Sequence, residues 1–101
     1  MYGTTARMRL VPGSEAIFRA HLDALQAYPV EGWISTTYSH SDVDPRDVWL
    51  SVVYESEELY REAAKSMNQH ALWIRLRSIL EADPDWHDGE VLYHAVPPQT
   101  P

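Results

Sequence analysis

Apolar and polar positions follow two different periods along this chain, and their order predicts the order of the secondary-structure elements. Strand-like patterns occupy residues 2–10, 33–40, 48–54 and 90–96. Helical patterns occupy residues 14–28 and 56–82. The resulting order, βαββαβ, predicts an α+β domain of the ferredoxin-like type, in which a four-stranded antiparallel sheet carries both helices on one face.

Helix-capping signals bound the first helical segment. Ser14 follows a Pro-Gly turn and is expected to be the N-cap residue. Phe18, Leu22 and Leu25 recur at helical spacing and form an apolar stripe that would face the sheet. Pro29 disfavours helical geometry at the residue before it, so the helix is expected to end at Tyr28.

The second helical region is predicted to consist of two pieces. Ser56 is the expected cap of the first piece, and residues 66–69 interrupt the pattern before a new apolar stripe begins at Leu72. The sequence leaves open whether this break is a mobile gate or a rigid kink. Residues 83–85 are expected to close the helix, and residues 86–89 to form a turn into the last strand.

The sheet face away from the helices is expected to be partly apolar. If Ala6, Met8, Leu50 and Val52 face the helices, the other face carries residues Thr5, Arg7, Arg9, Trp49, Ser51 and Val53. Such a surface, with aromatic anchors among polar groups, suits an interface, so we expect a homodimer through the sheet faces. In that arrangement Arg7 and Arg9 are expected to pair with acidic residues across the interface.

Composition narrows the possible partners. The chain has 101 residues, one domain's length, and we assign residues 1–96 to that domain and residues 97–101 to a flexible tail. A formal charge of −7 disfavours nucleic acid and anionic membrane surfaces as partners.

Cysteine is absent, which excludes disulfides, thiolate nucleophiles and Cys-based metal sites. Without a leader-like or spanning segment, the expected location is cytoplasmic.

Metal binding is not expected. The loop at residues 41–47 offers three carboxylates, but an EF-hand loop starting at Asp42 would have Asp47 and Val53 where glycine and glutamate are required. The five histidines form no i, i+4 pair on one helix. His87 and Asp88 are adjacent. We interpret their segment as a turn and not as a catalytic His-Asp pair.

Three stretches resemble a known family: residues 7–13 on the first strand, residues 49–56 leading into the second helical region, and residues 72–76 after the break at Ser66. With this layout, residues 2–96 resemble the antibiotic biosynthesis monooxygenase domain of the dimeric α+β barrel superfamily. The resemblance implies the dimeric barrel fold and a cofactor-independent oxygenase that converts phenols or quinols. The motifs are diffuse, so chemistry transfers less well than fold.

Haem-degrading members of that family use an Asn on the first strand, a Trp on the second helix and a His after its break. By the same spacing this chain has Ala6, Ala63 and Trp73 at those places, and His70 lies three residues from the histidine position. The resemblance therefore does not extend to haem degradation, and no cofactor is expected.

Oxidation of a phenol without a cofactor requires a base, an anion-stabilising group and an apolar pocket. His70 is the expected general base and Tyr54 the expected hydrogen-bond donor to the substrate oxygen. Trp73 and Trp33 would stack on a flat aromatic substrate, and Ala6 and Met8 would complete the pocket.

Each of these residues also has a purely structural interpretation. Tyr54 and Trp73 fit core or interface packing, and His70 fits a solvated or capping position. Two functions therefore remain: a small monooxygenase, or a non-catalytic dimeric domain that binds a small aromatic ligand or acts as a scaffold. An open pocket favours the first, and a gap filled by these side chains favours the second.

Overall fold

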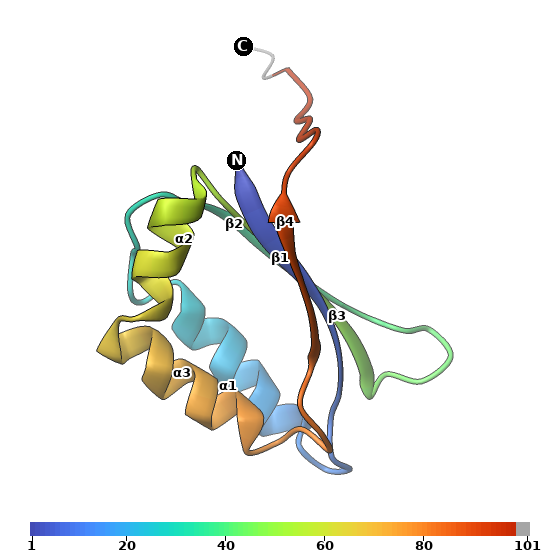
Figure 1. The fold of residues 1–101 in the computed structure, drawn as a ribbon. Coiled ribbons are helices and arrows are strands. Elements are labelled where there is room, and N and C mark those ends of the chain that lie inside the picture. Colours follow the sequence, from blue (N-terminus) through green and yellow to red (C-terminus); the bar gives the residue numbers. More distant parts are fainter. Residues whose placement is uncertain (99–101) are drawn as a thin grey trace.

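An antiparallel sheet forms one layer of the protein, and the helices form a second layer on one of its faces (Figure 1). The computed structural model describes residues 1–98. The strands are β1 (Tyr2–Arg9), β2 (Trp33–His40), β3 (Asp47–Tyr54) and β4 (Asp85–Glu90), in the spatial order β2-β3-β1-β4. The helices are α1 (Glu15–Leu25), α2 (Glu57–Ala64) and α3 (Met67–Arg77). The predicted ferredoxin-like α+β fold is confirmed.

The last strand lies earlier in the chain than predicted. β4 pairs antiparallel with β1, and this pairing places Trp86 beside Ala6 and Asp88 beside Thr4. Both predictions for this region were wrong: residues 86–89 are strand instead of turn, and residues 91–96 are not a strand. Backbone pairing with the free edge of β1 stabilises this strand more than the weak strand preference of its Asp and Gly residues destabilises it. Within the predicted tail, residues 97 and 98 have no regular structure, and residues 99–101 lie outside the described part.

The helix break is confirmed, although two helix ends differ from the prediction. Ser66 is the N-cap of α3 and accepts a hydrogen bond from the backbone N–H of Gln69 at 3.1 Å. Ser56 caps α2 in the same way. Ser14 occupies the N-cap position of α1, but its hydroxyl donates to the Val11 carbonyl at 2.7 Å and caps no helical N–H. α1 ends at Leu25 and α3 at Arg77, each earlier than the apolar pattern indicated.

The apolar core lies between the sheet and α3, toward the end of β1. Its buried members are Ala6, Met8, Leu10, Val48, Leu50, Leu76, Ile79 and Leu80. The predicted inward register of β1 and β3 is therefore correct. Gly3 on β1 is packed so tightly against β3 that a Cβ there would lie 2.1 Å from the Val52 carbonyl oxygen.

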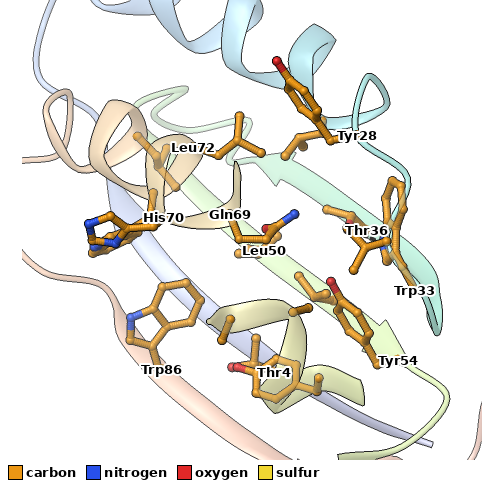
Figure 2. Close-up of a pocket in the computed structure, with 18 of the residues that line it drawn as sticks. Thr4, Tyr28, Trp33, Thr36, Leu50, Tyr54, Gln69, His70, Leu72 and Trp86 are labelled. Atoms are coloured by element: carbon orange, nitrogen blue, oxygen red, sulfur yellow. Dashed lines mark hydrogen bonds between the residues drawn. The ribbon is translucent and has the colours of Figure 1, made fainter. Parts of the chain in front are cut away.

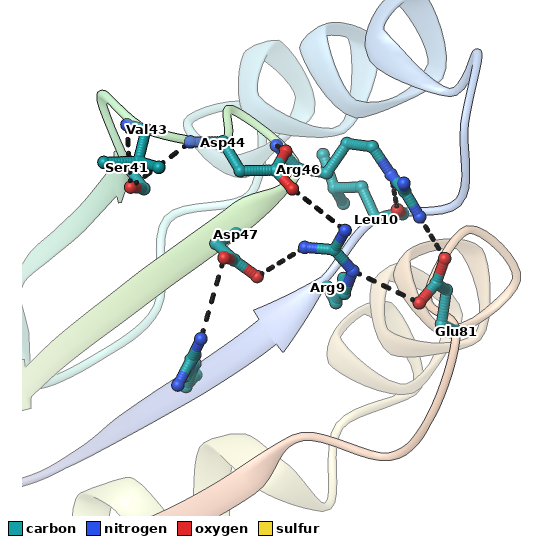
Figure 3. Close-up of polar contacts among 9 residues, drawn as sticks. Arg9, Leu10, Ser41, Val43, Asp44, Arg46, Asp47 and Glu81 are labelled. Atoms are coloured by element: carbon teal, nitrogen blue, oxygen red, sulfur yellow. Dashed lines mark hydrogen bonds and ion pairs between the residues drawn. The ribbon is translucent and has the colours of Figure 1, made fainter.

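A network of ion pairs joins the end of β1 to the β2–β3 loop and to the segment after α3 (Figure 3). The Arg9 guanidinium donates to Asp47 at 2.8 Å and to Asp44 at 2.9 Å, and it lies 3.4 Å from Glu81. Arg46 also binds Glu81. The backbone N–H of Arg46 and the guanidinium of Arg9 lower the pKa of the Asp44 carboxyl.

Both arginines have acidic partners within the chain, and their expected pairing across an interface stays a prediction. Arg9 is paired with acids of its own chain, and Arg7 lies 3.6 Å from Asp47. Pairing across an interface is therefore not needed to neutralise them.

The sheet face opposite the helices is more polar than predicted. Strand β2 contributes Thr37 and Ser39 to it, and β4 contributes His87. Trp49 is the large apolar side chain at the centre of this face, and it is 45% exposed. A shallow hollow of about 360 Å³ lies beside it.

Candidate active site

A cavity of about 450 Å³ lies between the helices and the sheet. Figure 2 shows side chains from the sheet and from the helices pointing toward this common space. The lining is mainly apolar and aromatic, with a few polar groups interspersed. This composition is typical of a small-molecule site, in which apolar walls bind the ligand and polar groups orient it.

Four of the predicted site residues line the cavity: His70, Tyr54, Trp73 and Trp33. Ala6 and Met8 lie instead in the buried apolar core and are not part of the cavity wall. Both were predicted to contact the substrate. Thr4 of β1 and Leu50 of β3 line the cavity in their place.

Tyr54 and Trp33 come from neighbouring strands at one end of the cavity. They are paired in the sheet, although the register of β2 shifts between Trp33 and Ser35. The Trp33 indole N–H donates to the Thr36 hydroxyl at 2.8 Å, which fixes the ring at the wall. Burial raises the pKa of the Tyr54 phenol, so this residue is a neutral hydrogen-bond donor at ordinary pH.

The break between α2 and α3 positions His70. Because Ser66 caps α3, Gln69 and His70 lie in the first turn of that helix, and both line the cavity. His70 remains exposed to solvent. One turn later, Trp73 packs toward the cavity from the same helix.

A second histidine lines the cavity, and the sequence analysis missed it. His21 on α1 is only 2% exposed. Its Nε2 lies 3.5 Å from the Tyr38 hydroxyl, at the outer limit of a hydrogen bond. Among residues 1–98, no group is a hydrogen-bond partner of its Nδ1. The signal was its spacing, since His21 follows Phe18 by three positions and precedes Leu25 by four on the apolar stripe.

Burial controls the charge of this pair. Desolvation lowers the pKa of the His21 imidazole, and the positive charge of Arg75 lowers it further. Burial raises the pKa of Tyr38 to about 12. Both groups are therefore neutral near pH 7.

The correct position of β4 brings two further residues to the cavity. Trp86 and Asp88 face the helices, whereas His87 faces the opposite side of the sheet and lies 3.0 Å from Asp85. Adjacent strand residues point to opposite faces, so His87 and Asp88 do not converge on one ligand. Asp88 accepts a hydrogen bond from the Tyr60 hydroxyl at 3.2 Å.

The described residues form neither a metal-binding cluster nor a membrane-spanning helix. Within residues 1–98, no three His, Asp or Glu side chains gather closely enough to hold a metal ion. No helix in this part of the chain has both the length and the apolarity needed to cross a membrane.

Comparison with known proteins identifies structural relatives. No family model and no curated protein matches the chain. A candidate antibiotic biosynthesis monooxygenase from Chloroflexus aurantiacus has a TM-score of 0.76 at 23% identity, covering 95% of this chain and 98% of that one. A conserved protein from Methanosarcina mazei has a TM-score of 0.78 at 13% identity, covering 87% and 89%.

A third similar structure is that of SnoaB from Streptomyces nogalater, a cofactor-independent oxygenase. Its TM-score is 0.73 at 11% identity, covering 92% of this chain and 94% of SnoaB. At these identities the likeness establishes the fold alone. The chain therefore has the fold of the antibiotic biosynthesis monooxygenases.

Proposed function

We propose that this protein is a cofactor-independent monooxygenase that acts on a phenolic or quinol small molecule. The observation that carries the proposal is the cavity of about 450 Å³ between sheet and helices, which is open and lined by aromatic side chains. A gap filled solid by the same side chains would have favoured a scaffold. The fold shared with a cofactor-independent oxygenase supports the same reaction class.

The cavity residues supply what this chemistry requires. Removing the substrate's hydroxyl proton gives an electron-rich anion that reacts with O₂; one oxygen atom enters the ring system, and the other leaves as water with two hydrogens of the substrate. His70 would accept the proton and the Tyr54 hydroxyl would donate to the resulting anion. Trp73 and Trp33 would hold the flat ring system between apolar walls.

Oxygen uptake tests this function. Purified protein without added metal or flavin is given a panel of anthrones, dihydroxynaphthalenes and hydroquinones, and O₂ consumption is compared with autoxidation. We expect enzyme-dependent uptake that decreases at least about tenfold in His70→Ala and Tyr54→Phe. His40→Ala is the matched control, because His40 is exposed on β2 and is not part of the cavity wall.

The alternative is a non-catalytic domain that binds a small aromatic ligand. The open cavity is compatible with it as well. Tight binding of panel compounds, measured by calorimetry, without any uptake above autoxidation would contradict the monooxygenase and support this alternative.

We also propose that two copies associate through the open sheet faces. Trp49 is exposed on that face, and the segment after β4 carries Leu92 and Tyr93, which are 94% and 87% exposed. Apolar side chains of this size are stabilised when a second surface covers them. Sedimentation equilibrium is expected to give a dimer that Trp49→Ser weakens; a monomer at every concentration would refute this assembly.

A further inference from the structure

Within residues 1–98, Asp88 is the one acidic side chain in the cavity wall, which is otherwise mainly apolar and aromatic. In the sheet it lies beside Thr4, which is buried on the side that faces the helices. Paired residues of neighbouring strands point to the same face, so the Asp88 side chain points toward the helices as well. This side chain is 33% exposed, which leaves its oxygens accessible to a ligand.

Two residues of α2 hold the Asp88 carboxylate in place. The Tyr60 hydroxyl donates to one carboxylate oxygen at 3.2 Å, and the Arg61 guanidinium lies 3.5 Å from the other. The Tyr60 ring contacts the rings of Tyr2 and Tyr54, at centroid distances of 5.4 Å and 5.7 Å. Tyr60 lines the cavity and Arg61 does not. The carboxylate is therefore oriented by its own neighbours before any ligand binds.

Asp88 and Tyr60 offer hydrogen-bond acceptors to the cavity. Burial, and secondly the negative charge of Asp88, raise the pKa of the Tyr60 phenol, so its hydroxyl keeps the proton that it donates to Asp88. The Tyr60 oxygen can then only accept a further hydrogen bond. A carboxylate has about four acceptor positions, and its two α2 partners use only some of them. A ligand group that binds at these two residues must therefore donate a hydrogen bond.

The proposed proton acceptor belongs to a different part of the wall. His70 is on α3, and Trp73, one turn later, contacts Trp86 of β4. Asp88 follows Trp86 by two residues on the same face of β4, and two strand residues span about 7 Å. This separation is comparable with the length of one substituted aromatic ring. A ring beside Trp86 that directs one hydroxyl toward His70 can therefore direct a second substituent toward Asp88.

We propose that Asp88, oriented by Tyr60, binds a second hydroxyl group of the aromatic substrate, so that the protein acts on aromatic diols in preference to monophenols. The second hydroxyl donates to the Asp88 carboxylate, while the first meets His70 and Tyr54. A hydrogen bond to a carboxylate polarises the donating hydroxyl, which makes the ring easier to oxidise. This inference rests on the proposed function and deepens it by naming the substrate class.

The test compares two ligands of the same ring: hydroquinone, which donates two hydrogen bonds, and its dimethyl ether, which donates none. Both affinities are measured by calorimetry under nitrogen, so that no oxidation occurs. The ratio of the hydroquinone affinity to the ether affinity is expected to fall about tenfold in Asp88→Asn, as for loss of one hydrogen bond to a charged group. The ether affinity itself should stay within about twofold, which shows that the cavity of the variant is intact.

Asp85→Asn is the matched control, because Asp85 is on the same strand, its side chain is 81% exposed, and it is not part of the cavity wall. An unchanged ratio in Asp88→Asn, or an equal fall in Asp85→Asn, overturns the inference. His70→Ala and the double variant with Asp88→Asn test whether two hydroxyls are bound. The losses in hydroquinone binding free energy should add, because each residue contacts its own hydroxyl. A double variant no weaker than one single variant overturns the second-hydroxyl site.

A second measurement avoids dependence on the fold of a variant. With ¹³C-labelled aspartate in the unmodified protein, saturating hydroquinone is expected to shift the Asp88 carboxyl carbon, and the dimethyl ether is not. An unshifted carbon with bound hydroquinone, or no binding of hydroquinone at all, overturns the inference; enzyme-dependent O₂ uptake with an anthrone would then leave the proposed function standing. The expected ratios and carbon shift without O₂ uptake on any diol would support the Asp88 site and remove the oxygenase.

Discussion

Trp73 of α3 lies against Trp86 of β4, with ring centroids 5.8 Å apart and ring planes inclined at 59°. This contact links the helical layer to the edge strand of the sheet, and both rings line the cavity. It explains how a short strand with an unfavourable sequence closes one side of the site. Trp73 gives β4 an aromatic surface to pack against, and Trp86 does the same for α3.

Trp86→Ala is expected to lower the free energy of unfolding by about 1–2 kcal/mol, because the edge strand loses its aromatic contact with α3. Urea unfolding measures the change. Val43→Ala, at a fully exposed loop position, serves as control and should shift the free energy by less than about 0.5 kcal/mol. Unfolding of Trp86→Ala at the same urea concentration as the unmodified protein would show that this contact contributes little.

Gly3→Ala is expected to destabilise the protein by about 1–3 kcal/mol, since the added methyl group would overlap the Val52 carbonyl and push β1 away from β3. The matched control is its neighbour in the sheet, Gly89, where an added Cβ meets no atom within 4 Å. Thermal unfolding should separate the two variants clearly. Equal midpoints for both alanine variants would contradict the tight β1–β3 contact.

Ser66→Ala is expected to cost about 1 kcal/mol, because the first turn of α3 loses its cap at the Gln69 N–H. Ser14→Ala keeps all helical N–H partners of α1, since the Ser14 hydroxyl donates to a loop carbonyl instead. Loss of helix content measured by circular dichroism should therefore be larger for Ser66→Ala. The prediction fails if Ser14→Ala loses as much helix.

The pH dependence of stability should show the buried imidazole. The His21 pKa lies below its ordinary value of 6.5, mainly through desolvation and secondly through Arg75, with the neutral Tyr38 facing it. Below pH 6.5 the unfolded chain gains a proton here that the folded chain does not, so the free energy of unfolding falls as pH decreases toward the folded-state pKa. His21→Phe is expected to flatten this part of the curve in urea titrations. An unchanged slope in that variant would assign the effect to other groups.

The position of β4 shows where sequence periodicity misleads. Residues 90–96 alternate in a strand-like way, yet most of their side chains are exposed, whereas Asp85–Glu90 holds the strand. Pairing with β1 and contact with Trp73 decide the register, and neither is visible in a local pattern. Features with strong local signals, such as the Ser56 cap of α2 and the break between α2 and α3, were predicted correctly.

The candidate site divides in the same way. The sequence could predict that four residues line the cavity, because the elements that carry them were predicted correctly: Trp33, Tyr54, His70 and Trp73. Trp86 and Asp88 were missed with β4. His21 was missed for a different reason: its spacing places it on the apolar stripe of α1, but a polar histidine was not counted in that stripe, and the facing Tyr38 ring shows its burial.

The apolar side chains that follow β4 have a thermodynamic consequence. Leu92, Tyr93 and Val96 are exposed in a single copy, so they contribute almost nothing to its free energy of folding. A chain ending at Val91 keeps the backbone hydrogen bond from Val91 to Met1, and a single copy should unfold at the same point as before. Any stability that this shortened chain loses only at high protein concentration therefore reports what these side chains contribute to the proposed association of two copies.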